Sequence, residues 1–186
     1  AGAVFTTAFA FFARGYISAQ ILYTLVALAI GGSYTTGLIL ITEQYVPERR
    51  GMATGFYIAS SSLGYVVSLV LSGLTIPLGG YRLSFYVTCI ATIVGGALPW
   101  ITLAKTHETV VARQTQQSFT KEVVKNRPAM LLITAYTIHC WELLGMWAWT
   151  PAFITACLIH QGVGGMDAAG FGAYLTAGFH LAGLVA

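Results

Sequence analysis

Apolar residues run along this chain in blocks separated by short polar connections. The four inner blocks are each long enough for the roughly 20 apolar residues that a helix needs to cross a bilayer core of about 30 Å, and the two outer blocks are shorter. Hydrocarbon offers the backbone no hydrogen bonds, so such blocks cross as helices, which bond internally. The pattern predicts six crossings, at about 1–13, 19–43, 52–76, 83–104, 129–159 and 168–186.

Composition agrees with this pattern. Hydrophobic residues make up 56% of the chain, charged residues only 8%, and the mean hydropathy is +0.74. These values exclude an ordinary soluble domain and predict an all-α, polytopic helical membrane protein. Ala1 and Ala186 both lie inside apolar blocks, so the two outer crossings are expected to be truncated. No signal peptide is recognised at the start, and we treat the chain as an internal part of a longer one.

The basic residues predict an orientation, because Lys and Arg near crossing ends collect on the cytoplasmic side. The two connections on the basic side, 44–51 and 105–128, are therefore expected to be cytoplasmic, in a bacterial inner membrane. Apolar spacing in 105–128 suggests a short helix lying along the membrane surface. Nucleic-acid binding is not needed to explain these charges. The basic side holds Arg49, Arg50, Lys105, Arg113, Lys121, Lys125 and Arg127, whereas the opposite side holds only Arg14 and Arg82.

One carboxylate, Glu142, lies near the middle of the crossing 129–159, with His139 one turn before it. An ionisable group at that depth costs roughly 2.5–3.5 kcal/mol on insertion scales, so it usually faces a protein interior or a water-filled path. The pair could relay a proton, or it could be a structural couple buried between helices. His180 could likewise line a cavity or simply pack. The face proposed to line a pore comprises Tyr136, His139, Glu142, Met146, Trp149 and Phe153, spaced by three and four.

Two further features concern helix contacts. Pro151 removes a backbone donor and leaves a carbonyl near Trp147 without its helical partner, which predicts a bend. In the third crossing, small residues recur at every fourth position and form one narrow strip. Such a strip allows close packing in lipid, and it could also let helices rock. Its members are Ser60, Gly64, Ser68 and Ser72.

The connection Glu43-Gln44-Tyr45-Val46-Pro47-Glu48-Arg49-Arg50-Gly51, followed by a helix of small residues, resembles the cytoplasmic link between the fourth and fifth helices of major facilitator superfamily transporters. The resemblance implies that the crossings correspond to helices three to eight of twelve. Residues 1–104 would then end the first six-helix half, 105–128 would be the central loop, and 129–186 would begin the second half. It also implies alternating access and a cytoplasmic latch formed by Glu43 and Arg50, with Gly51 beside them.

The resemblance is incomplete where drug antiporters of this superfamily carry a Gly-Pro motif in their fifth helix. Leu69 replaces the proline, and Ser68 and Ser72 replace two glycines. Symport and antiport therefore both stay open.

The expected function is secondary active transport of a small organic solute, with proton coupling as one option. The alternative is a transport-inactive relative that senses a ligand or helps to assemble another membrane complex. An enzyme is not expected, because His107-Glu108 lacks the second histidine of a zinc H-E-x-x-H helix. Neither a metal nor a cofactor is expected, since the three cysteines form no C-x-x-C pair.

Overall fold

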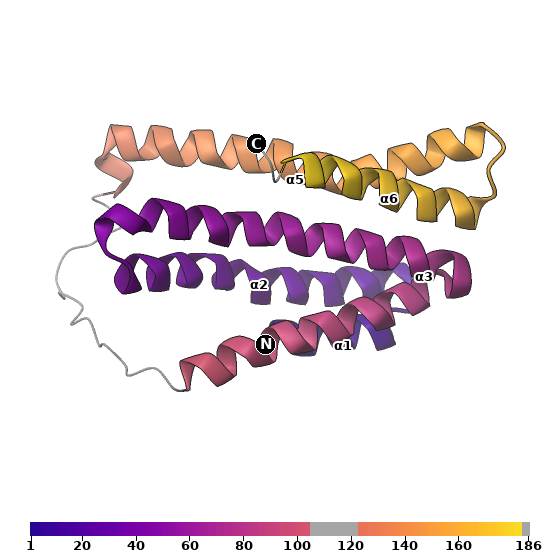
Figure 1. The fold of residues 1–186 in the computed structure, drawn as a ribbon, viewed down its shortest axis with the longest axis horizontal. Helices are drawn as coiled ribbons and strands as arrows, with labels where there is room; N and C mark the ends of the chain where they lie inside the picture. Colours follow the sequence, from indigo (N-terminus) through magenta and orange to yellow (C-terminus); the bar gives the residue numbers. More distant parts are fainter. Residues whose placement is uncertain (105–122, 184–186) are drawn as a thin grey trace.

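The computed structural model describes residues 1–104 and 123–183, and all the elements among them are α-helices. This confirms the predicted all-helical fold. Figure 1 shows the helices lying roughly along the long axis of the molecule. The surface helix predicted within 105–128 falls largely outside the described residues. In chain order the helices are α1 (Gly2–Phe12), α2 (Tyr16–Gln44), α3 (Pro47–Leu103), α5 (Arg127–His160) and α6 (Gly165–Gly183).

Local sequence explains where α2 begins and ends. At its start, the Ser18 hydroxyl accepts hydrogen bonds from the backbone N–H groups of Arg14 and Gly15, at 3.2 and 3.0 Å. These bonds satisfy donors that have no partner near a helix start. At its end, Pro47 disfavours a helical conformation for the residue before it, Val46, and α2 stops at Gln44. The helix is therefore a few residues longer than the predicted crossing 19–43.

The long helix α3 folds back on itself at Gly79 and Gly80, where the backbone leaves the helical region. Gly80 has a φ of 67°, which a residue with a side chain adopts only at a cost. The two arms on either side correspond to the predicted crossings 52–76 and 83–104. A hydrogen bond of 3.0 Å from the Ser84 hydroxyl to the Ser72 hydroxyl joins the arms near the bend.

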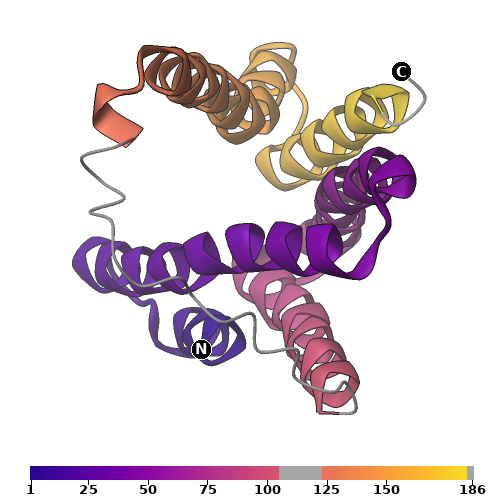
Figure 2. The same cartoon turned by 90° about the vertical axis from the view of Figure 1, so that its left-hand side faces the viewer.

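Following the predicted halves of the chain, we call α1, α2 and α3 the first group of helices and α5 and α6 the second, although α6 packs more extensively on α3 than on α5. Figure 2 shows α6 (yellow) between α3 and α5, and α6 packs against both. The largest buried cluster lies at the first of these contacts, where Val66 and Leu69 of α3 meet Ala173 and Ala177 of α6. Small residues let helix backbones approach closely, which is a main source of association between helices in lipid.

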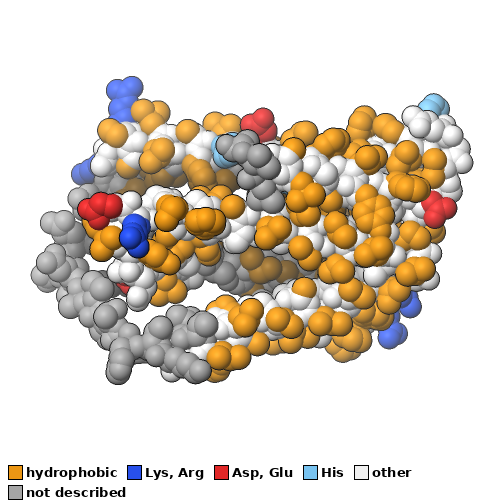
Figure 3. All heavy atoms as spheres, in the orientation of Figure 1, with side chains coloured by type: hydrophobic (Ala, Val, Ile, Leu, Met, Phe, Trp, Pro, Cys, Tyr) orange, Lys and Arg blue, Asp and Glu red, His pale blue; other side chains and the backbone are white. Residues whose placement is uncertain are grey.

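Most of the surface is apolar. Figure 3 shows hydrophobic side chains covering the long sides of the molecule, with most charged side chains near its two ends. Within the described residues, three helices are long and apolar enough to cross a membrane: Tyr16–Gln44, Pro47–Ile101, which contains the bend, and Arg127–His160. These features fit an integral membrane protein. The count of six crossings stays a prediction.

Gly172 lets α6 lie directly against α5, and this contact gives a stability prediction. A methyl group added at Gly172 would lie 2.5 Å from Thr155 Oγ1 and 3.0 Å from the Pro151 carbonyl oxygen of α5. We expect Gly172→Ala to lower the free energy of unfolding by about 1–3 kcal/mol, because overpacking forces the two helices apart. Unfolding in mixed micelles, followed by circular dichroism, measures this change.

Gly178→Ala is the matched control for this prediction. It lies on the same helix, and an added methyl group would meet no atom within 4 Å. Replacing glycine by alanine inside a helix normally stabilises it by about 0.5–1 kcal/mol. Equal stability losses in both variants would contradict the packing described here.

Candidate functional site

We call the boundary between the two groups of helices the seam. Along one edge of it α3 and α6 pack tightly, and along the other α5 lies farther from α2 and α3. Among the described residues, no Cα atom of α5 lies within 8 Å of a Cα atom of α2 or α3. Long side chains nevertheless cross this part of the seam at two levels. These two levels form the candidate functional site.

The first level is the mid-seam cluster, which consists of Tyr65 (α3), Trp147 (α5) and His180 (α6). The Tyr65 and Trp147 rings are stacked, with centroids 5.0 Å apart and an angle of 11° between their planes. His180 meets both rings edge-on, at 4.7 Å from Tyr65 and 4.9 Å from Trp147. All three side chains are half-buried. The cluster therefore joins both groups of helices through contacts that such aromatic pairs favour.

A hydrogen bond strengthens this cluster. The Tyr65 hydroxyl donates to the backbone carbonyl oxygen of Trp147 at 2.6 Å. In an α-helix that carbonyl would accept from the N–H of the residue four positions later, which is Pro151 and has none. The sequence predicted a carbonyl without a helical partner near Trp147. The structure supplies the partner from the other group of helices.

The second level is the tyrosine bridge, which consists of Tyr34 (α2), Tyr57 (α3) and Tyr136 (α5). The hydroxyl oxygens of Tyr136 and Tyr34 lie 3.5 Å apart, and the Tyr34 and Tyr57 ring centroids lie 5.9 Å apart. Gly37 makes room for this arrangement, because a methyl group there would collide with the Tyr57 hydroxyl. All three tyrosines lie about ten residues, or roughly 15 Å, from the predicted cytoplasmic ends of their helices.

The face of α5 that was predicted from spacing divides in the structure. Tyr136 reaches the tyrosine bridge although it is 52% exposed, whereas Met146, Trp149 and Phe153 make no such contact and are exposed at 62%, 74% and 69%. The spacing explains this division, since steps of three and four that average about 3.4 residues drift around a helix of 3.6 residues per turn. Several half-buried positions of α5 follow a neighbouring line: Cys140, Leu143, Trp147, Thr150 and Ile154.

His139 and Glu142 lie on the exposed part of α5, away from the mid-seam cluster. Both are exposed, and neither side chain makes a hydrogen bond or ion pair in the described part of the chain. A carboxylate at this depth requires water or a polar partner. In this conformation the described residues supply no such partner to the Glu142 side chain.

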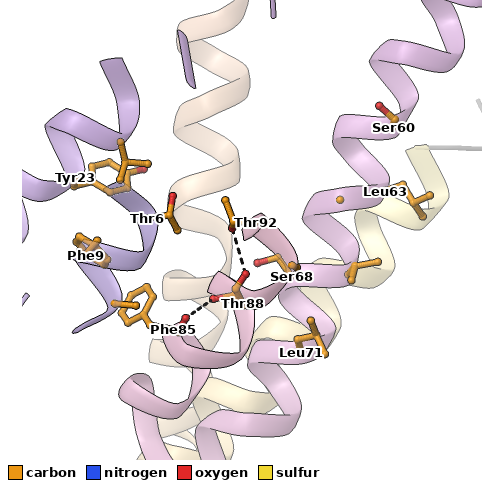
Figure 4. Close-up of a pocket in the computed structure, with 15 residues that line it drawn as sticks. Thr6, Phe9, Tyr23, Ser60, Leu63, Ser68, Leu71, Phe85, Thr88 and Thr92 are labelled. Atoms are coloured by element: carbon orange, nitrogen blue, oxygen red, sulfur yellow. Dashed lines mark hydrogen bonds between the residues drawn. The ribbon is translucent and has the colours of Figure 1, made fainter. Parts of the chain in front are cut away.

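The strip of small residues on α3 mainly lines a cavity inside the first group of helices. The cavity has a volume of about 630 Å³, and Ser60, Gly64 and Ser68 form part of its wall. Figure 4 shows Thr6 and Phe9 on one side of it and Ser68 and Thr88 on the other. Ser72, by contrast, joins the two arms of α3. Three of the four positions thus border open space, and one makes a helix contact.

At the predicted latch, Arg50 serves the local backbone. Its Nε donates to the Tyr45 carbonyl oxygen at 2.9 Å, at the residue that ends α2. Glu43 is exposed and forms no ion pair with Arg50. An added methyl group at Gly51 would meet nothing within 4 Å. In this conformation the two charged residues therefore lie near the same connection without being paired.

The side chains along the seam are of kinds that can bind an organic molecule. Its side chains offer ring faces and hydroxyl groups, which can bind an organic molecule, and no group of three or more metal-binding side chains occurs in the described residues. Sequence reasoning identified His180 and the carbonyl near Trp147, but it missed Tyr65 and the tyrosine bridge. A large polar ring within the small-residue face of α3 was the available signal for Tyr65.

Comparison with known proteins identifies the family to which the chain belongs. The chain is 24% identical over 159 residues to a Haemophilus influenzae protein described as a "Putative metabolite transport protein", a match that covers 77% of this chain and 38% of that relative. The chain thus spans about two fifths of the length of the relative. No solved structure matches. The family model of the Major Facilitator Superfamily matches residues 1–186, the whole chain, and the chain therefore belongs to that superfamily.

Proposed function

We propose that this chain is part of a secondary active transporter that moves a small organic solute across a bacterial cytoplasmic membrane by alternating access, with a proton as the coupling ion. Membership of the superfamily and the name of the relative support a transporter of small molecules. The main structural support is the seam, where α5 is joined to α2 and α3 by side chains alone in the described residues. Contacts of this kind can separate without unfolding either group of helices.

The residues along the seam favour a neutral or cationic solute. The two levels present five rings of Tyr and Trp together with His180, and aromatic faces bind organic groups and cations. An anion would require Arg or Lys at mid-depth. In the described residues, these side chains occur only near the helix ends: Arg14, Arg49, Arg50, Arg82, Lys125 and Arg127.

We assign the coupling role to Glu142, with His139 as its neighbour in a proton relay. Glu142→Gln removes the negative charge, which is costly to hold inside a membrane, and keeps nearly the same side-chain shape. We expect this variant to fold normally and to lose proton-driven uptake or become uncoupled from the proton gradient. Uptake of a panel of labelled metabolites into proteoliposomes that contain the intact protein, at several pH values, measures this.

Asp167→Asn is the matched control for this test, because it makes the same carboxylate-to-amide change at an exposed helix start. It should retain uptake. Flux from the Glu142→Gln variant that equals the unsubstituted protein at every pH would remove Glu142 from the mechanism. A folded protein that binds a solute but moves none would instead support the sensing alternative.

We also assign a gating role to Glu43 and Arg50, which would pair in a conformation other than the one described here. An exposed ion pair contributes about 0–1 kcal/mol, so Glu43→Gln should change the ratio of inward-facing to outward-facing molecules by up to about fivefold. Labelling of single cysteines on the two sides of the membrane measures that ratio. Arg49→Gln changes a neighbouring charge and should leave it unaltered. Identical labelling in the Glu43 variant and the unsubstituted protein would contradict the latch.

A further inference from the structure

We propose that Tyr65 is a positioning residue of the transport cycle, whose hydroxyl holds the bend of α5 at Pro151 against α3 and so keeps the seam closed at mid-depth. The proposal rests on the alternating access proposed above. It adds a specific contact, the bond from Tyr65 to the Trp147 carbonyl, as the link that must break when the two groups of helices separate.

The acceptor exists because of Pro151. In hydrocarbon a backbone carbonyl without a partner costs several kcal/mol, so the carbonyl that Pro151 leaves open must find a donor. Ser and Thr on the same helix often serve this purpose, but the nearby Thr150 donates instead to Met146. In the described residues, the donor to the Trp147 carbonyl is Tyr65. The bend at Pro151 thus creates the acceptor that Tyr65 binds.

The donor comes from the other group of helices and is well oriented. The Tyr65 hydroxyl lies 2.6 Å from the Trp147 carbonyl oxygen, and its ring stacks on the indole of the same residue. Since α3 and α5 have no Cα atoms within 8 Å of each other in the described residues, this side chain spans a gap that the backbones leave open. Movement of α5 away from α3 therefore breaks both contacts at once.

The part of α5 beyond the bend is attached differently. There the Thr155 hydroxyl donates to the Pro151 carbonyl at 2.7 Å, and Gly172 of α6 lies directly against these two residues. This segment is thus packed on α6, its neighbour in the same group. The segment before the bend depends on Tyr65 and on the tyrosine bridge for its contacts across the seam. Breaking the Tyr65 bond should consequently release the predicted cytoplasmic half of α5.

The test uses Tyr65→Phe in the intact protein, which removes the hydroxyl and keeps the stacking ring. Nitroxide labels at Met52→Cys and Leu131→Cys, two exposed positions on α3 and α5, report the separation across the seam by double electron–electron resonance in a cysteine-free background. Loss of one hydrogen bond changes the equilibrium between closed and open seam by roughly two- to tenfold. We therefore expect the ratio of long to short distances to rise by about that factor.

Tyr174→Phe is the matched control, because Tyr174 also lies at the contact of α3 with α6 but its hydroxyl makes no hydrogen bond in the described residues. Its distance distribution should equal that of the unsubstituted protein. An unchanged distribution in the Tyr65 variant, or an equal shift in both variants, would overturn the proposal.

Pro151→Ala identifies the acceptor. Alanine restores the backbone N–H that the Trp147 carbonyl lacks, so adding Tyr65→Phe to this variant should shift the distances by less than half as much. A full shift in the double variant would show that another partner is involved. Uptake assays separate this inference from the proposed function. Uptake with unaltered distances contradicts the Tyr65 contact alone. The expected shifts without uptake confirm that the contact holds the seam, but they contradict transport and, with it, a role of Tyr65 in a transport cycle.

Discussion

The structure depends on one constraint, which is that every backbone polar group in hydrocarbon needs a partner within the protein. Helices meet this requirement by themselves, and the described residues are accordingly built from helices. Where the constraint is locally broken, at Pro151, a side chain from another helix meets it. Because hydrocarbon cannot hydrogen-bond the Trp147 carbonyl, that carbonyl binds Tyr65, and this bond connects the two groups of helices.

The same constraint explains why the two groups are joined unevenly. Small residues let α6 approach α3 and α5 closely, at Gly170 and Gly172 in particular, and contacts of this kind are extensive and hard to open. Elsewhere α5 is reached by long aromatic side chains. Each of these contacts contributes about 0.5–1.5 kcal/mol. A seam with one tight edge and one loose edge can open about the tight edge, which is what alternating access requires.

Three residues of the site illustrate which of its features the sequence could predict. Pro151 was informative because its missing N–H has the same consequence in any helix. The face around Glu142 was less informative, since steps of three and four indicate one face only when they average 3.6 residues. The ring of Tyr65 beside the small residues of α3 was visible in the sequence, but its acceptor could not be found without coordinates, because that acceptor lies 82 positions away along the chain.

The sequence by itself determined the helical class, the membrane environment, the family resemblance and the open carbonyl of the fifth helix. The resemblance rests on the motif at 43–51, and the other features follow from hydropathy and from local backbone chemistry, which act within about twenty residues. The tertiary structure decided that Ser60, Gly64 and Ser68 border a cavity, that Arg50 donates to the Tyr45 carbonyl at the end of α2 and that Tyr65 crosses the seam. The reason is physical: in lipid, apolar faces are interchangeable, so only the packing of whole helices determines which side chains meet.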